Sequence, residues 1–228
     1  MSLKPVETKW IGAIFDMDGV IADNMGYHTR AWELFIQKYA PHLEIGDVTP
    51  HYGKTNADLM GFVFGRALTP EEVDRYGEEK EGLYRELYAR DMAPLPGLLN
   101  LLKGLRKSGI RTAVATSAPK SNVDFLLDGL GIRDCFDLVI DAAGVRRGKP
   151  DPEIYLKSAR RLGCQPAACI VFEDALAGVE AGRRAGMKVV GVATTLPADR
   201  LSQTDLVIKN FSEITVPQIV KLMNSSPK

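Results

Sequence analysis

Two aspartates stand two residues apart, directly after an apolar run near the start of the chain. Residues 11–15 form the run, and Asp16, Met17, Asp18 and Gly19 follow it. A short, continuous apolar run of this kind predicts a buried strand. Asp16 then falls at the carboxyl end of that strand, where open α/β sheets place their ligands. Two carboxylates this close repel each other, so they are tolerated best with a cation between them or with one of them protonated.

The aspartate pair could equally serve a turn and a helix cap, because Asp is common in both. Further polar groups along the chain favour chemistry instead. Thr116 and Ser117 follow the apolar stretch 111–115 and precede a helix, so a hydroxyl and backbone N–H groups there could hold an anion. Lys149 lies in a Gly-Lys-Pro-Asp-Pro loop, where the following proline favours extended backbone. Taken alone, Ser117 could be a simple N-cap of the following helix, and Lys149 could be a solvated loop lysine.

A second acidic pair, Glu173 and Asp174, ends the apolar stretch 169–172. Asp174 alone could simply cap the next helix. If the pair lies near Asp16, however, the site offers three or four oxygen ligands, which suit Mg²⁺. A Mg²⁺ cofactor bound by these oxygens would have coordination positions left for water and for a phosphate.

These groups together predict phosphoryl transfer to a carboxylate. Asp16 would attack phosphorus in line, while Mg²⁺ and Lys149 offset the repulsion between carboxylate and phosphate. Thr116 and nearby N–H groups would hold the equatorial oxygens. Asp18 would give a proton to the leaving oxygen and then take one from the incoming nucleophile. We expect the phosphate and Asp16 to raise the pKa of Asp18.

The elements that must position these residues alternate between strand and helix from residue 98 onward. We expect helices over 98–107, 119–130, 152–162 and 176–185, and strands over 111–115, 138–140, 169–172, 188–192 and 206–208. Such alternation is typical of an α/β fold, a Rossmann-like parallel sheet core with helices on both faces.

Residues 24–93 show only helical patterns and turns. Asn56 is a candidate N-cap of one helix, and Pro70 is the expected first residue of another. We therefore expect residues 1–23 and 94–228 to form a catalytic core. Residues 24–93 would form an inserted all-helical cap that acts as a substrate lid, with hinges where the chain crosses between the two.

Composition excludes several classes of protein. The 228 residues carry a formal net charge of zero, so bulk electrostatics attract neither nucleic acid nor an anionic membrane. No stretch approaches the ~18 apolar residues of a membrane span, and the first residues lack the apolar core of a signal peptide. Cys135, Cys164 and Cys169 are scattered, which predicts reduced thiols. We expect a cytoplasmic protein, a monomer or small homo-oligomer, that binds a small phosphorylated substrate.

At these motifs the chain resembles the haloacid dehalogenase superfamily, in the branch of β-phosphoglucomutases and small-molecule phosphatases that carry a helical cap. The resemblance spans roughly residues 11–211, and its motifs are DMDGV at 16–20, Thr116-Ser117, GKPDP at 148–152 and FEDALAG at 172–178. It implies Asp16 as nucleophile, Asp18 as acid and base, and Thr116 and Lys149 as phosphate ligands. It also implies Mg²⁺ held by Asp16, the backbone carbonyl of Asp18, Asp174 and Glu173. True dehalogenases lack the second aspartate, so Asp18 argues against dehalogenation.

The expected cap resembles the mutases in part. Residues 27–32, Tyr-His-Thr-Arg-Ala-Trp, are similar to the first cap helix of β-phosphoglucomutases, whose His contacts the acid/base Asp. Lys80 stands where that group has a sugar-phosphate lysine. The mutases' arginine for the distal phosphate is absent, since Asn56 takes its place and Lys54 lies nearby. His28, Lys54, Asn56 and Lys80 are therefore candidate substrate-binding residues.

These observations predict a Mg²⁺-dependent phosphatase that hydrolyses a small phosphorylated metabolite, a sugar phosphate or similar, through an aspartyl-phosphate. A β-phosphoglucomutase-like isomerase is the alternative, because it uses the same intermediate but returns the phosphoryl group to a sugar. A receiver-type domain that accepts a phosphoryl group on an aspartate is a third possibility. It would require a shorter chain without an inserted cap.

Overall fold

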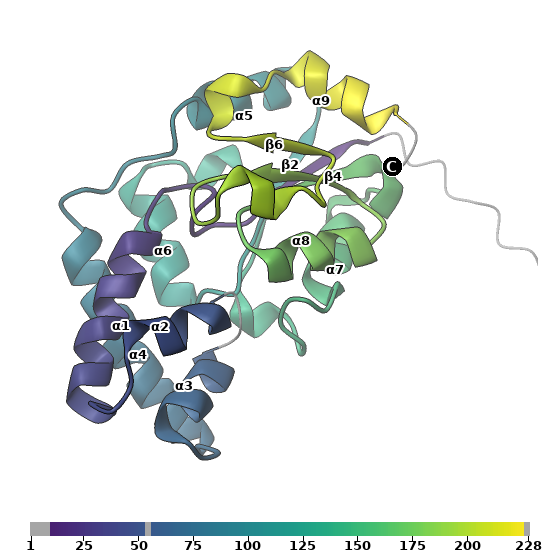
Figure 1. The fold of residues 1–228 in the computed structure, drawn as a ribbon. Coiled ribbons are helices and arrows are strands. Elements are labelled where there is room, and N and C mark those ends of the chain that lie inside the picture. Colours follow the sequence, from purple (N-terminus) through teal and green to yellow (C-terminus); the bar gives the residue numbers. More distant parts are fainter. Residues whose placement is uncertain (1–9, 53–55, 226–228) are drawn as a thin grey trace, which may run out of the picture.

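A six-stranded sheet forms the centre of the computed structural model, which describes residues 10–52 and 56–225 (Figure 1). Its strands are β1 Gly12–Phe15, β2 Arg111–Ala115, β3 Leu138–Ile140, β4 Cys169–Glu173, β5 Lys188–Val192 and β6 Leu206–Ile208. The strand order is β3-β2-β1-β4-β5-β6, and every neighbouring pair is parallel. This is the order of the Rossmann fold. The predicted α/β class is confirmed.

Helices occupy most of the remaining described chain. The α-helices are α1 Met25–Tyr39, α2 Ile45–Val48, α3 Asn56–Phe64, α4 Pro70–Tyr88, α5 Leu98–Lys107, α6 Lys120–Gly129, α7 Glu153–Leu162, α8 Leu176–Arg184 and α9 Val216–Met223. Short 3₁₀ turns are η1 Thr49–His51, η2 Arg133–Cys135, η3 Ala142–Gly144, η4 Pro166–Ala168, η5 Ala198–Leu201 and η6 Phe211–Glu213. The expected helices after residue 94 are all present, with ends that differ by one residue or none.

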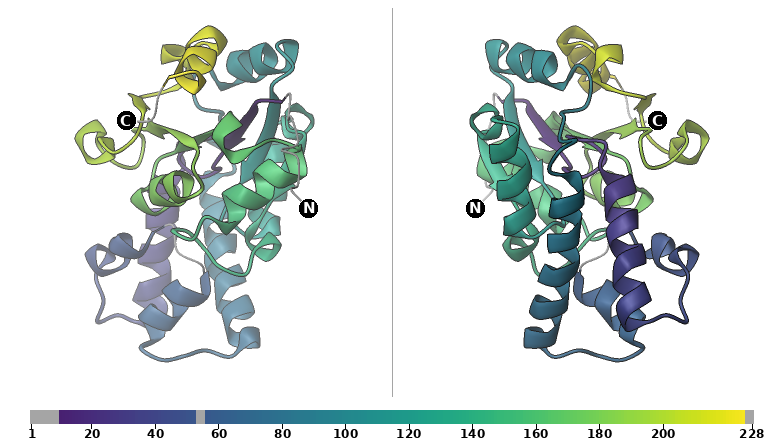
Figure 2. Two further views of the ribbon diagram at one scale, coloured as in Figure 1. Left: turned by 90° about the vertical axis from the view of Figure 1, so that its right-hand side faces the viewer. Right: turned by 90° about the vertical axis from the view of Figure 1, so that its left-hand side faces the viewer.

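Both faces of the sheet are buried under helices, as Figure 2 shows in two views. Along β1, Phe15 packs into the cluster that includes residues of α5, α6 and α9. Its neighbour Ile14 points to the opposite face, into the cluster that includes residues of α7 and α8. Successive strand residues face opposite ways, so a strand covered on both sides must be apolar throughout. This burial explains the continuous apolar run that the sequence shows.

Helices α1 to α4 gather at one end of the molecule, opposite α5 and α9 (Figures 1 and 2). They share a hydrophobic cluster of their own, which includes Trp32, Phe35 and Met60. Helix α4 begins as expected, with Pro70 as its first residue and Thr69 as the N-cap in a capping box. None of the described helices is both long and apolar enough to cross a membrane.

The two chain segments that lead into and out of these helices run side by side. The backbone N–H of Leu95 donates to the carbonyl of Ile21 at 2.7 Å. Tyr84 and Tyr88, on the last turns of α4, belong to the same hydrophobic cluster as Phe15 of the sheet. The base of this helical group is therefore anchored to the core.

Candidate active site

The predicted catalytic residues meet at the carboxyl ends of β1 and β4. The backbone N–H of Asp16 donates to the carbonyl of Phe172 at 3.0 Å, which holds the end of β1 beside the end of β4. The chain continues from β1 toward β2 on one side and from β4 toward β5 on the other. Such a reversal opens a crevice between the two strand ends, where α/β proteins bind ligands. Glu173 and Asp174 lie at the same place.

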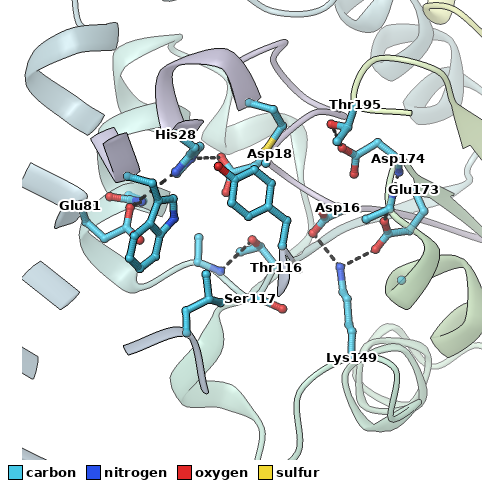
Figure 3. A pocket seen from close by; sticks show the side chains of 18 of the residues that line it. Asp16, Asp18, His28, Glu81, Thr116, Ser117, Lys149, Glu173, Asp174 and Thr195 are labelled. Atoms are coloured by element: carbon cyan, nitrogen blue, oxygen red, sulfur yellow. Dashed lines mark hydrogen bonds and ion pairs between the residues drawn. The ribbon is translucent and has the colours of Figure 1, made fainter. Parts of the chain in front are cut away.

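Lys149 reaches this crevice from the loop that leads into α7. Its Nζ atom lies 2.8 Å from Asp16 Oδ1 and 2.5 Å from Glu173 Oε1, and its side chain is almost fully buried (Figure 3). The loop is fixed from the other side because Asp151 Oδ1 accepts a hydrogen bond from the N–H of Glu153 at the start of α7. The lysine is thus a structural partner of two carboxylates and not a solvated side chain.

Three carboxylates converge on one point. Oxygens of Asp16, Glu173 and Asp174 all lie within 4.8 Å of one another. Burial raises the pKa of Asp16 to about 7, although the charge of Lys149 opposes the rise. Burial and the charge of Glu173 likewise raise the pKa of Asp174 well above its usual range. One lysine does not balance two buried carboxylates and the mostly buried Asp16, and an all-oxygen donor set with excess negative charge fits Mg²⁺.

Glu173 is already saturated with hydrogen bonds. Its Oε1 accepts from Lys149 and, at 2.5 Å, from the hydroxyl of Tyr155. Its Oε2 accepts from the backbone N–H groups of Asp174 and Ala175. A carboxylate accepts about four such bonds, so Glu173 would have to release one to bind an ion directly. Asp16 and Asp174 would be freer to bind such an ion.

Two glycines, which lack a side chain, make room for the carboxylates of Glu173 and Asp174. A Cβ atom on Gly178 of α8 would lie 1.8 Å from Glu173 Oε1. A Cβ atom on Gly19 would lie 2.0 Å from Asp174 Oδ2, and Gly19 also has a positive φ of 74°. The hydroxyl of Thr195 donates to that same oxygen of Asp174. Thr195 was not predicted, and its position shortly after β5 is the one signal that the sequence gives.

Asp18 points away from the carboxylate cluster toward α1. Its Oδ1 accepts a 2.6 Å hydrogen bond from Asn24 Nδ2 and lies 3.5 Å from His28 Nε2. Asn24 in turn accepts a hydrogen bond from the N–H of Gly19. Burial raises the pKa of Asp18, but His28, Asn24 and Lys80 together outweigh it, so the pKa is lowered. In the unliganded site these neighbours stabilise the carboxylate, and the rise expected with a bound phosphate stays a prediction.

Thr116 and Ser117 form the turn between β2 and α6. The buried Thr116 Oγ1 accepts a 3.0 Å hydrogen bond from the N–H of Ala118. This contact orients the hydroxyl and leaves its own hydrogen available for a ligand. Ser117 is partly exposed and lines the cavity beside it.

One cavity of about 110 Å³ lies between these elements. The predicted residues on its wall are Asp16, Asp18, Thr116, Ser117, Lys149, Glu173, Asp174, His28 and Lys80. Apolar side chains of the helical group complete the wall, among them Trp32 and Leu59. Lys54 lies outside the described residues. Helix α3 begins at Asn56, whose side chain is likewise not described.

Lys80 faces the cavity but is held by its neighbours. Its Nζ atom lies 2.9 Å from Glu81 Oε1 and 3.0 Å from His28 Nδ1, and 3% of the side chain is exposed. Glu81 Oε2 accepts a hydrogen bond from Asn122 Nδ2 of α6 at 2.6 Å. Asn24, Glu81 and Asn122 were not predicted, because nothing in their sequence spacing indicates these partners.

The fold and the site agree with a comparison against known families. Residues 12–186 match the family model of haloacid dehalogenase-like hydrolases. The chain belongs to this family of enzymes, and it is not a receiver domain.

Individual relatives cover nearly the whole chain. It is 33% identical over 210 residues to hexitol phosphatase A of Escherichia coli, spanning 90% of this chain and 93% of the relative. It is also 33% identical over 220 residues to β-phosphoglucomutase of Bacillus subtilis, spanning 89% and 91%. The crystal structure of a HAD hydrolase of family IA, variant 3, from Entamoeba histolytica superposes with a TM-score of 0.86. That match has 29% identity and covers 94% of this chain and 100% of the other.

Proposed function

We propose that this protein is a Mg²⁺-dependent phosphatase that hydrolyses a small phosphorylated metabolite, such as a sugar or sugar-alcohol monophosphate. The observation that carries the proposal is the convergence of Asp16, Lys149 and Asp174 beside an acid/base candidate, Asp18, that faces the other way. A nucleophile with its cation and a separate proton donor are the two groups that phosphoester cleavage through an aspartyl-phosphate needs.

In the first half-reaction Asp16 attacks phosphorus, and the bond from phosphorus to the substrate oxygen breaks. Lys149 neutralises charge on the nucleophile and the phosphoryl oxygens, while the Thr116 hydroxyl donates to one of those oxygens. Asp18, protonated in the complex, gives its proton to the leaving alkoxide. Because its pKa is lowered in the free site, the anionic substrate must raise it on binding.

In the second half-reaction Asp18 takes a proton from water, and the resulting nucleophile releases phosphate from Asp16. Asp16 and Asp174 would hold Mg²⁺, with the backbone carbonyl of Asp18 and with Glu173 alongside. The ion would supply neutralisation of the phosphate charge and orientation of its oxygens.

We further propose that residues 24–93 act as a cap over residues 1–23 and 94–228. His28, Trp32 and Lys80 already line the cavity from the helical side, as a lid that excludes water would require. The engaged Lys80 and the apolar wall favour a substrate whose leaving group is uncharged. A cytoplasmic location remains a prediction.

The second candidate is a β-phosphoglucomutase-like isomerase, favoured by the B. subtilis relative of equal identity. A mutase must grip a second phosphate. Lys80, the cation that the helical group presents among the described cavity residues, is paired with Glu81. Hydrolysis is therefore the better-supported function.

Phosphorus NMR separates the two functions. The protein is incubated with Mg²⁺ and, in parallel, with hexitol phosphates, sugar monophosphates, and β-glucose 1-phosphate with a trace of glucose 1,6-bisphosphate. Inorganic phosphate that grows with time, and that an Asp16→Asn variant does not produce, supports the phosphatase. Glucose 6-phosphate formed without free phosphate would identify a mutase instead.

A further inference from the structure

A continuous chain of polar contacts runs from helix α6 of the sheet domain to the proposed proton donor. Asn122 of α6 donates to Glu81 Oε2 at 2.6 Å, and Lys80 Nζ lies 2.9 Å from Glu81 Oε1. Lys80 Nζ also lies 3.0 Å from His28 Nδ1. Asn122, Glu81 and Lys80 are all buried. Water does not compete with contacts that are buried to this degree, so each group fixes the next.

The chain of contacts determines which nitrogen of His28 carries its proton. An ammonium group can only donate, so Lys80 makes Nδ1 the acceptor. In the neutral ring the hydrogen is then on Nε2, which lies 3.5 Å from Asp18 Oδ1. Within the described part of the chain, Nε2 is the buried side-chain nitrogen or oxygen that lacks a hydrogen-bond partner. It is thus poised to donate toward Asp18 or toward an oxygen beside it.

Asn122 is suited to join the two parts of the molecule. Its Nδ2 donates to Glu81 while its Oδ1 accepts a 2.8 Å hydrogen bond from Arg85 Nη1. Glu81 and Arg85 lie four residues apart, on successive turns of the same face of α4. The side chain has no exposed surface. Helix α6 also follows directly on the Thr116–Ser117 turn, so one short segment carries both the phosphate-binding hydroxyl and this contact.

We propose that Asn122 is a positioning residue for proton transfer by Asp18, acting through Glu81, Lys80 and His28 when α4 is docked on α6. This inference rests on the phosphatase function proposed above. The step concerned is the transfer of the Asp18 proton to the leaving oxygen as that oxygen separates from phosphorus and the bond from Asp16 to phosphorus forms. Without Asn122, Glu81 loses a buried donor, and Lys80 and His28 lose their fixed orientation.

The test is a series of substituted phenyl phosphates of similar size, from 4-nitrophenyl phosphate to unsubstituted phenyl phosphate. A good leaving group needs little help from an acid, and a poor one needs much. The quantity measured is kcat/KM, which covers steps up to departure of the leaving group. For Asn122→Leu we expect a loss of roughly 10- to 100-fold with phenyl phosphate but less than about 3-fold with 4-nitrophenyl phosphate.

The matched control is Ser121→Ala. Ser121 contacts Arg85 and Glu78 at the same junction but stands outside the chain of contacts to Asp18. This variant should leave the dependence on the leaving group unchanged. A second route to the same result is Glu81→Gln, which interrupts the contacts from the other side. Combined with Asn122→Leu it should steepen the dependence no further than either change alone.

Nitrogen-15 NMR of His28 provides a readout that does not depend on turnover. The wild-type ring should carry its hydrogen on Nε2, and Asn122→Leu should mix the two tautomers. An equal loss of kcat/KM across the phenyl phosphates, or an unchanged tautomer in a folded variant, would overturn the proposal. If the wild-type protein releases phosphate neither from these esters nor from the sugar and hexitol phosphates above, it is the phosphatase function itself that fails.

Discussion

Lys149 Nζ lies 2.8 Å from Asp16 Oδ1, although 133 residues separate the two in the chain. The contact joins the end of the first strand to a loop that follows the third. Burial raises the pKa of Asp16, and Lys149 counteracts part of that rise. The ion pair therefore exists before any substrate arrives, and the proposed nucleophile is oriented in advance.

Replacing Lys149 by Met should reduce both activity and stability. The variant leaves Asp16 and Glu173 as uncompensated buried charges, which costs about 3 kcal/mol in the free energy of unfolding without Mg²⁺. Added Mg²⁺ should restore part of that loss by mass action. Urea denaturation without and with Mg²⁺ measures the loss of stability and its recovery, and hydrolysis of 4-nitrophenyl phosphate measures the loss of activity. An equal loss with and without the ion would argue against a metal site beside Lys149.

Replacing Asp18 by Asn should separate the two half-reactions. With 4-nitrophenyl phosphate the leaving group departs without an acid, so Asp16 can still be phosphorylated. Water then lacks its base, and the phosphorylated enzyme should accumulate. Stopped-flow absorbance should show a burst of about one equivalent of nitrophenol followed by slow turnover. Asp16→Asn should show no burst, and a burst in that variant would exclude Asp16 as the nucleophile.

Replacing Gly178 by Ala should impair the site by steric displacement. The added Cβ would overlap Glu173 Oε1 at 1.8 Å, so Glu173 and with it Lys149 must shift. A displacement of about 1 Å at the chemistry can cost roughly 10²-fold in kcat/KM. Gly26→Ala is the control, because no atom lies within 4 Å of a Cβ built there. Equal activity of the two variants would contradict the assigned position of Glu173.

The pH dependence of the free energy of unfolding should show the stabilising contribution of the buried Glu81 carboxylate. Burial raises the pKa of Glu81, but Lys80, His28 and Asn122 outweigh it, so the pKa is lowered from 4.5. A lowered carboxyl pKa means that the unfolded chain binds more protons, so stability rises with pH through that range. The contribution is complete above about pH 5 and is lost as pH falls through the lowered pKa.

The variant for this prediction is Glu81→Gln. It should be less stable than the wild type by about 3 kcal/mol at pH 7, and the difference should shrink below about pH 4. Chemical denaturation at several pH values checks the trend. A difference that stays constant from pH 3 to pH 7 would show that the charge of Glu81 does not stabilise the fold.

Much of the fold was predictable from local patterns. The strands at 111–115, 138–140, 188–192 and 206–208 have the predicted bounds, because a short and largely apolar run marks each of them. Gly109 and Gly186 also end the helices before the strands at 111–115 and 188–192. The predicted acids and Lys149 also lie together, since parallel strands share one carboxyl edge.

The unpredicted residues are those that act through distant partners. Thr195 supports Asp174, Asn24 holds Asp18, and Asn122 supports Glu81. Polar residues of these types are frequent on any surface, and no spacing marks the ones that fold inward. The lowered pKa of Asp18 could not be predicted for the same reason. It depends on side chains of a helix that follows Asp18 in the chain, and sequence spacing alone does not show that this helix packs back against Asp18.

The hydrogen bond from Leu95 to Ile21 brings the start and end of the helical insertion to a single point. Because the ends of the insertion adjoin, it can be lengthened, reshaped or exchanged while the strands of the sheet keep their register. If the insertion is the proposed cap, selection could change which molecule is recognised without disturbing the groups that we propose break the bond to phosphorus. We expect a chimaera that replaces residues 24–93 by the equivalent segment of a relative, joined at these two junctions, to acquire the relative's substrate specificity.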